Sequence, residues 1–287
     1  MPVKINAILR LIRFDKPIGT LLLLWPTLGA LWLAARGLPE LKLLVIFSLG
    51  TFLTRSAGCV INDLADQELD GSVERTRQRP LVSGDASVKQ ALMIALLLSL
   101  LSFGLVLFTN TLTIVLSLVG ALLAITYPFM KRHTHLPQLV LGAAFSWGIP
   151  MAFAAQTNSL PSELWLLYLA NVLWTVSYDT QYAMVDREDD LKVGIKSTAI
   201  LFGELDRAAV AALQLCCLLC LLLIGPRFEL GLFYYLGVLG SAATFFWQQR
   251  LIRKREPAMC FRAFLNNHYS GMLLFIGIVL HFLTSSG

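Results

Sequence analysis

The sequence predicts an all-α membrane protein, because its apolar content is high, its charged content is low, and its apolar residues gather in long runs. Hydrophobic residues make up 56% of the chain and charged residues 14%, and the mean hydropathy is +0.69. An ordinary soluble domain carries roughly 25% charged residues. Backbone groups in lipid must be paired within the structure, and the alternating pattern of a barrel strand is absent, so each run is predicted to be a helix.

Nine apolar runs are long enough to cross a bilayer, for which about 20 residues are needed. We predict them at 18–36, 42–61, 89–108, 112–129, 137–155, 164–184, 207–225, 229–248 and 267–284. Ahead of the first run, Ile5, Ile8, Leu9 and Ile12 share one helical face beside basic residues. That pattern predicts a short helix lying along the membrane surface. All nine spans are assigned to a single domain over 1–287.

The basic residues predict which side of the membrane each loop faces. With the N-terminus in the cytoplasm, only Arg36, Lys42 and Arg227 of the 23 lysines and arginines face the other side. Arg55 lies inside a predicted span, and all the others fall on cytoplasmic segments. This asymmetry predicts a cytoplasmic N-terminus. It also accounts for the net charge of +5 without a nucleic-acid partner, whose binding needs a contiguous basic face.

The acidic residues gather in two places. Six of the 18 lie between Asp63 and Asp85, and seven lie between Asp179 and Asp206. Each group comes at or after the end of an even-numbered span, so both are expected at the cytoplasmic face. The chain thus has a coarse internal repeat, with helices 1–4 over about 18–129, helices 5–8 over about 137–248, and a ninth helix added.

The first acidic group is patterned as one side of a helix. Asn62, Asp66 and Asp70 are four residues apart and share a helical face with Arg55. Like charges this close destabilise a helix unless a cation lies between them. Carboxylate and amide oxygens are ligands for hard cations such as Mg²⁺.

The second acidic group predicts a similar stripe. Asp186 and Asp190 share a face, with Tyr182 and Asp179 one and two turns earlier. Basic residues on neighbouring cytoplasmic loops complete a candidate diphosphate site; they are Lys131, Arg132, Arg75, Arg79 and Lys196. The positive-inside rule explains these basic residues equally well, and snorkelling to the interface is an alternative for Arg55.

These motifs resemble the UbiA superfamily of intramembrane aromatic prenyltransferases, and within it the bacterial 4-hydroxybenzoate polyprenyltransferase branch. The resemblance rests on Asn62-Asp63-x-x-Asp66-x-x-x-Asp70, Arg75-Thr76-x-x-Arg79-Pro80, Tyr127-Pro128-x-x-Lys131-Arg132, Tyr178-Asp179-Thr180-x-Tyr182 with Asp186-Arg187-Glu188-Asp189-Asp190, and Gly194-x-Lys196-Ser197. It covers the chain nearly end to end. It implies a helical bundle around a central cavity, in a bacterial inner membrane, with the active site facing the cytoplasm.

The resemblance also implies a reaction and the residues that carry it. The expected reaction is Mg²⁺-dependent transfer of a polyprenyl group from polyprenyl diphosphate to the carbon ortho to the hydroxyl of 4-hydroxybenzoate, in ubiquinone biosynthesis. The expected metal ligands are Asn62, Asp66, Asp70, Asp186 and Asp190, with Lys131 and Arg132 stabilising the leaving diphosphate. The expected substrate-binding residues are Arg55, Asn62, Asp63, Arg75, Arg79, Tyr127, Asp179, Tyr182 and Lys196.

Two alternatives belong to other classes. A secondary transporter also has repeated halves and intramembrane charges, but it is expected to place them near the midplane rather than at one face. A cytidine-linked alcohol phosphotransferase shares part of its aspartate motif with Asp70-Gly71-x-x-Glu74-Arg75, but it leaves the second acidic group unexplained. A prenyltransferase acting on a different aromatic acceptor is a third alternative.

Overall fold

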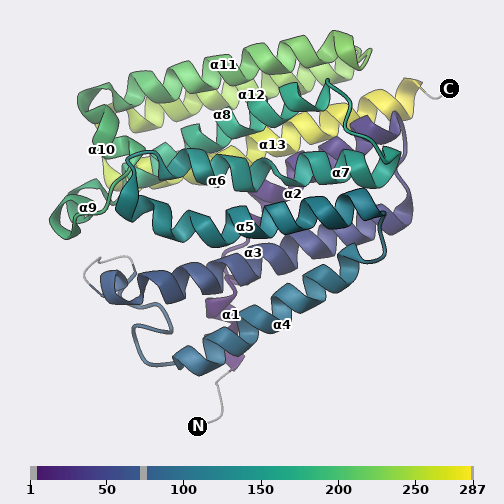
Figure 1. Ribbon diagram of the computed structural model, residues 1–287. Coiled ribbons are helices and arrows are strands. Elements are labelled where there is room, and N and C mark those ends of the chain that lie inside the picture. Colours follow the sequence, from purple (N-terminus) through teal and green to yellow (C-terminus); the bar gives the residue numbers. More distant parts are fainter. Residues whose placement is uncertain (1–4, 72–75, 286–287) are drawn as a thin grey trace.

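The structure of the protein, a computed structural model, describes residues 5–71 and 76–285 (Figure 1). All regular secondary structure within those ranges is helical, which confirms the predicted all-α class. The α-helices are α1 (Ile5–Leu11), α2 (Ile18–Ala35), α3 (Leu41–Asp70), α4 (Val88–Val106), α5 (Thr111–His133), α6 (Pro137–Ser146), α7 (Gly148–Thr157), α8 (Leu164–Ala183), α9 (Arg187–Val193), α10 (Thr198–Phe202), α11 (Asp206–Arg227), α12 (Leu232–Leu251) and α13 (Pro257–Ser285). Two short 3₁₀ turns, Gly203–Leu205 and Ile252–Lys254, join neighbouring helices.

The chain is a multi-pass membrane protein. Seven stretches of the described residues are helical, long and apolar enough to cross a bilayer. Helices α8 and α12, of 20 residues each, run in the same bundle but are not among those seven. The count of nine spans and the side of the N-terminus therefore stay predictions, as does the pairing of 18–129 with 137–248.

Two helices extend well beyond their predicted spans of 42–61 and 267–284. Helix α3 has 30 residues and α13 has 29. At 1.5 Å per residue, each is roughly 45 Å long, which exceeds the hydrocarbon thickness of about 30 Å. Hydropathy detects only the apolar part of a helix, so it missed the polar turns that carry the first acidic group beyond the lipid.

One predicted span, 137–155, is two helices that meet at Trp147. Pro150 has no N–H to donate to the carbonyl of Ser146, and its ring crowds that carbonyl, so the regular helix ends there. The indole of Trp147 donates to the Leu116 carbonyl at 2.8 Å. Gly148 lies against Thr27, since a Cβ at Gly148 would lie 2.6 Å from the Thr27 Oγ1. The break thus brings α7 close to α2.

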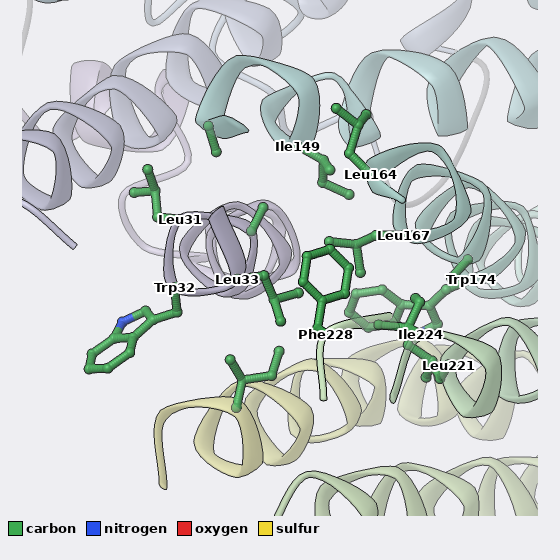
Figure 2. Packing of buried hydrophobic residues seen from close by; sticks show 14 of the residues in the cluster. Leu31, Trp32, Leu33, Ile149, Leu164, Leu167, Trp174, Leu221, Ile224 and Phe228 are labelled. Atoms are coloured by element: carbon green, nitrogen blue, oxygen red, sulfur yellow. The ribbon is translucent and has the colours of Figure 1, made fainter. Parts of the chain in front are cut away.

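The main hydrophobic core joins helices from both ends of the sequence (Figure 2). Leu31 and Leu33 of α2, Ile149 of α7, Leu167 of α8 and Ile224 of α11 are all buried in it. Many leucines of α4 and α5 instead face outward, such as Leu96, Leu100, Leu118 and Leu122. Outward leucines along a spanning helix suit a surface solvated by lipid tails.

The acidic groups lie at one end of the bundle. Helices α3, α5 and α8 finish near α9 and α10 at that end (Figure 1, left). We call it the acidic end, and it holds Asp63, Asp66, Asp186 and Asp206. Gly194 ends α9 in the left-handed conformation, with φ of 74°, which favours glycine. Ser197 then caps α10 by accepting from the Ile200 N–H.

Candidate active site

A cavity of about 1740 Å³ opens within the bundle and reaches the acidic end. Its deeper wall is largely apolar and comes from α2, α3, α5, α6 and α7, including Leu22, Phe47, Ala124 and Met151. Its outer wall is charged. Eight predicted site residues line the cavity, namely Arg55, Asn62, Asp63, Arg79, Tyr127, Asp179, Tyr182 and Asp186. The cavity therefore combines an apolar chamber with a polar mouth.

The first acidic stripe lies on a continuous helix, as predicted. The Asn62 amide donates to Asp66 Oδ2 at 3.0 Å, one helical turn away. Asp66 is 2% exposed, and the same oxygen forms an ion pair with the ammonium of Lys131 on α5. The other oxygen, Asp66 Oδ1, is buried without a hydrogen-bond partner among the described residues. A buried carboxylate oxygen left open in this way is suited to a cation.

The donor chemistry fits Mg²⁺, although the described residues do not complete its site. Within 5–71 and 76–285, no three acidic, histidine or cysteine side chains form a metal-binding group. The side chain of Asp70 and all of Arg75 lie outside the described part of the chain. The full ligand set of Asn62, Asp66, Asp70, Asp186 and Asp190 stays a prediction.

Asp63 is an ion-pair anchor at the mouth of the cavity. It is 1% exposed and accepts from Arg13 Nη2 at 2.7 Å and 2.9 Å. Arg79 Nη1 lies 3.0 Å from the same carboxylate. Asp63 thus holds the N-terminal segment and the loop after α3 against α3. Its two oxygens are already paired, unlike Asp66 Oδ1.

The end of α5 links the two acidic groups. Arg132 Nη2 donates to the Ala65 carbonyl of α3 at 2.5 Å. On the other side, the Lys196 N–H donates to the Lys131 carbonyl at 2.9 Å. The Lys196 ammonium donates to the His133 carbonyl at 3.3 Å. Three of the five predicted diphosphate-binding cations, Lys131, Arg132 and Lys196, therefore lie where α3, α5 and the segment after α9 meet.

Tyr127 lies between the two acidic groups. It lines the cavity together with Asn62 and Asp63 of the first group and with Asp179 and Asp186 of the second. Segments more than a hundred residues apart thus contribute to the same cavity, while a divalent cation shared between them stays a prediction.

The second acidic group departs from its prediction. We expected Asp179, Tyr182, Asp186 and Asp190 on one continuous helical stripe, and that is wrong. Helix α8 ends at Ala183, and Asp186 caps the separate helix α9 with φ of −100° and ψ of 6°. The Asp190 N–H still donates to the Asp186 carbonyl at 2.8 Å. Asp186 and Asp190 thus remain one helical turn apart, but on α9, which is separated from α8 by a turn.

Arg55 sits deeper in the cavity wall. Its Nη1 donates to Cys59 Sγ, and its guanidinium carbon lies 5.9 Å from the centre of the Phe145 ring. Its buried Nε has no hydrogen-bond partner among the described residues. A Cβ on Gly19 would lie 2.5 Å from that Nε, so the glycine leaves room for the guanidinium.

Several residues at the site were missed in the sequence. The hydroxyl of Tyr178 is buried without a hydrogen-bond partner among the described residues, on the cavity wall. Arg13, Arg187, Asp206 and Arg255 form ion pairs at the cavity mouth. Tyr178 and Arg187 stand inside the quoted motifs, but no role was predicted for them. The other three showed only a charge, which surface residues share.

Comparison with known proteins identifies the family. The model of the UbiA prenyltransferase family matches residues 23–277. A 4-hydroxybenzoate octaprenyltransferase of Aeromonas salmonicida (strain A449) is 60% identical over 277 residues, covering 96% of each chain. A protein of the same name from Vibrio cholerae (El Tor Inaba N16961) is 61% identical over 278 residues, covering 97% of this chain and 98% of that one.

Solved structures share the fold. The apo structure of a UbiA homolog from Aeropyrum pernix K1 has a TM-score of 0.81 at 25% identity, covering 91% of this chain and 97% of that one. A UbiA homolog from Archaeoglobus fulgidus bound to GPP and Mg²⁺ has a TM-score of 0.72 at 17% identity, covering 96% and 99%. From the matched sequence and the shared helical bundle together, we conclude that this chain belongs to the UbiA prenyltransferase family.

Proposed function

We propose that this enzyme transfers a polyprenyl group from polyprenyl diphosphate to 4-hydroxybenzoate, at the ring carbon ortho to the hydroxyl, and releases diphosphate. The observation that carries the proposal is an apolar cavity whose polar mouth is lined from both acidic groups, by Asn62 and Asp63 and by Asp179 and Asp186. Asn62 in turn contacts Asp66, which pairs with Lys131. The names of relatives about 60% identical over nearly the whole chain support the same acceptor and donor.

Asn62, Asp66, Asp70, Asp186 and Asp190 would hold Mg²⁺ at the cavity mouth. When bound, the metal neutralises the diphosphate and so favours its departure. The Archaeoglobus fulgidus homolog bound to GPP and Mg²⁺ supports the use of this metal with a prenyl diphosphate. The open Asp66 Oδ1 supports it from this chain itself.

Cationic side chains stabilise the charge that develops on the leaving group. Lys131, Arg132 and Lys196 gather at one point, and we assign Arg75 and Arg79 to the same task. As the allylic C–O bond breaks, its electron pair stays with the diphosphate oxygen, where these cations lower its energy. The prenyl carbon is left as a delocalised carbocation.

Arg55 binds the carboxylate of the aromatic acid in our proposal. A guanidinium can pair with a carboxylate through two hydrogen bonds, and the nearby Phe145 ring offers an aromatic surface. The buried hydroxyl of Tyr178 offers a further donor on the facing helix. With the ring so held, its ortho carbon forms the new C–C bond, and its proton passes to a carboxylate or to the released diphosphate.

The apolar part of the cavity receives the isoprenoid chain and excludes water that would quench the carbocation. The positive-inside pattern supports an active site facing the cytoplasm of a bacterial inner membrane. A product prenylated in this way serves ubiquinone biosynthesis.

The test is a transfer assay with the purified chain in lipid nanodiscs. Labelled 4-hydroxybenzoate and octaprenyl diphosphate should yield a labelled lipid with Mg²⁺ and none with EDTA. A panel of other phenols in place of 4-hydroxybenzoate tests the acceptor. Absence of transfer from a folded wild-type protein would refute the proposal, and faster transfer to another phenol would correct the acceptor.

A further inference from the structure

A buried aspartate outside both motifs ties together the elements around the second acidic group. Asp206 begins α11 and is 0% exposed. Its Oδ2 accepts from Arg187 Nη2 at 2.8 Å. Both of its oxygens also accept from Arg255 Nε, at 3.0 Å and 3.1 Å. A carboxylate buried to this degree is tolerated only because two guanidinium groups compensate it.

Arg187 is the link between Asp206 and the second acidic group. It is the first residue of α9 and follows Asp186 directly. Besides Asp206, its Nη2 donates to the Gly203 carbonyl at 3.0 Å and to the Ala199 carbonyl. Ala199 lies in the first turn of α10, Gly203 begins the 3₁₀ turn that follows it, and Asp206 begins α11. One side chain thus joins the Asp186–Arg187 peptide to two packed helices.

Helix α9 is short and partly exposed, so its position depends on tertiary contacts. It has seven residues, none of them buried, and a helix so short is unstable without tertiary contacts. Asp186, Glu188, Asp189 and Asp190 add mutual repulsion within five positions. Its far end is tied separately, through the Lys196 N–H and the Lys131 carbonyl.

We propose that Asp206 is a positioning residue which, through Arg187, holds Asp186 and Asp190 in the arrangement needed to bind the divalent cation. The proposal rests on the function proposed above. Its chemical basis is that groups behind metal ligands fix the direction of those ligands, and that their loss typically weakens metal binding by about 10- to 100-fold. Because the charge of Arg187 is compensated by Asp206, we assign Arg187 to anchoring α9 and not to binding the diphosphate.

The experiment compares four single variants of the full chain in nanodiscs: Asp206→Asn, Arg187→Gln, Arg255→Gln and Glu204→Gln. Glu204 is the matched control. It lies 3.6 Å from Arg255 in the same cluster, but its side chain is 92% exposed. Binding of Mn²⁺ in the presence of inorganic pyrophosphate is measured by electron paramagnetic resonance, without turnover. Thermal unfolding is followed on the same samples.

We expect Asp206→Asn and Arg187→Gln each to weaken Mn²⁺ binding by about 10-fold or more. The double variant Asp206→Asn/Arg187→Gln should bind Mn²⁺ as tightly as the single variant with the lower Mn²⁺ affinity, because both substitutions break the same contact. In turnover, both variants should need more Mg²⁺ for half-maximal rate while the KM for 4-hydroxybenzoate stays the same. Glu204→Gln should match the wild type, and Arg255→Gln should lower thermal stability more than Mn²⁺ affinity.

Unchanged Mn²⁺ affinity in Asp206→Asn, with only a lower unfolding temperature, would overturn the positioning role. If Asp206→Asn does not fold, Arg187→Lys decides the matter, since it keeps the charge but loses the guanidinium fork. A wild-type chain that binds Mn²⁺ in an Asp206-dependent way but transfers no prenyl group would refute the proposed function and leave this inference standing.

Discussion

Each acidic region is held by a buried aspartate paired with arginines, but the motif supplies the aspartate in one region and an arginine in the other. Near the first, buried Asp63 on α3 receives Arg13 and Arg79 from segments outside the helix. Near the second, buried Asp206 on α11 receives Arg187 from the acidic segment itself. In the first region the motif helix α3 holds other segments in place. In the second, the motif helix α9 is itself held in place by α11.

The difference follows from helix length. Asp63 and Asp66 lie inside a 30-residue helix, whose backbone holds its own side chains in register. Asp186 and Asp190 lie on a seven-residue helix that follows a turn, so their position depends on contacts made elsewhere. The comparison teaches that two motifs similar in sequence can be positioned by different physical means.

The largest fall in turnover is expected when a proposed metal ligand is removed from either acidic region. Asp66→Ala and Asp190→Ala should each lower kcat by about 100- to 1,000-fold, because each removes a proposed ligand of the cation that neutralises the leaving diphosphate. Turnover is measured at saturating substrate over a range of Mg²⁺ concentrations. Substantial activity in either variant would mean that its region is dispensable for metal binding.

The next largest effect is a loss of stability, and it distinguishes Asp63, which forms ion pairs, from the proposed metal ligands. Asp63→Ala leaves Arg13 and Arg79 without their shared buried carboxylate, which should destabilise the protein by about 3–5 kcal/mol. Differential scanning fluorimetry measures the loss, and limited proteolysis reports on the segment 76–87. Asp85→Ala is the control, since its pair with Arg10 is largely exposed and should contribute about 1 kcal/mol or less. Equal losses in both variants would contradict the anchoring role of Asp63.

A smaller effect concerns the acceptor, which neither acidic region binds in our proposal. Arg55→Ala should raise the KM for 4-hydroxybenzoate by about 10- to 100-fold, the usual value of a hydrogen bond to a charged group. The KM for the polyprenyl diphosphate should stay the same. A normal KM for the aromatic acid in a folded variant would show that Arg55 has another role.

The smallest effect tests the space around Arg55. In Gly19→Ala, the new methyl group meets the guanidinium at 2.5 Å, and this flexible group should shift rather than unfold the protein. The KM for 4-hydroxybenzoate should rise several-fold, by roughly 1 kcal/mol of lost binding. Gly104→Ala, where no atom outside its own stretch of helix lies within 4 Å of the added carbon, should leave it unchanged. A rise in Gly104→Ala as well would point to a general loosening of the helices.

Much of the fold was predictable from the chain because it depends on local properties. Apolar runs specify spanning helices wherever lipid is the solvent, and the predicted starts of α2, α4, α5 and α8 agree closely with the structure. The acidic clusters were visible in the same way, and so was their gathering at one end. The polar extension of α3 followed from the spacing of its acidic residues, whereas the early start of α13 at Pro257 was not predicted, since its first turns carry no hydropathy signal.

The partners of the charged residues came only from packing in three dimensions. No spacing rule indicates that Asp63 pairs with Arg13, 50 residues earlier, or that Asp206 pairs with Arg255, 49 residues later. The turn between α8 and α9 likewise depends on where Arg187 finds its acceptors. Hydropathy is a property of each segment on its own, whereas the choice among several nearby charges depends on which helices become neighbours once the bundle has formed.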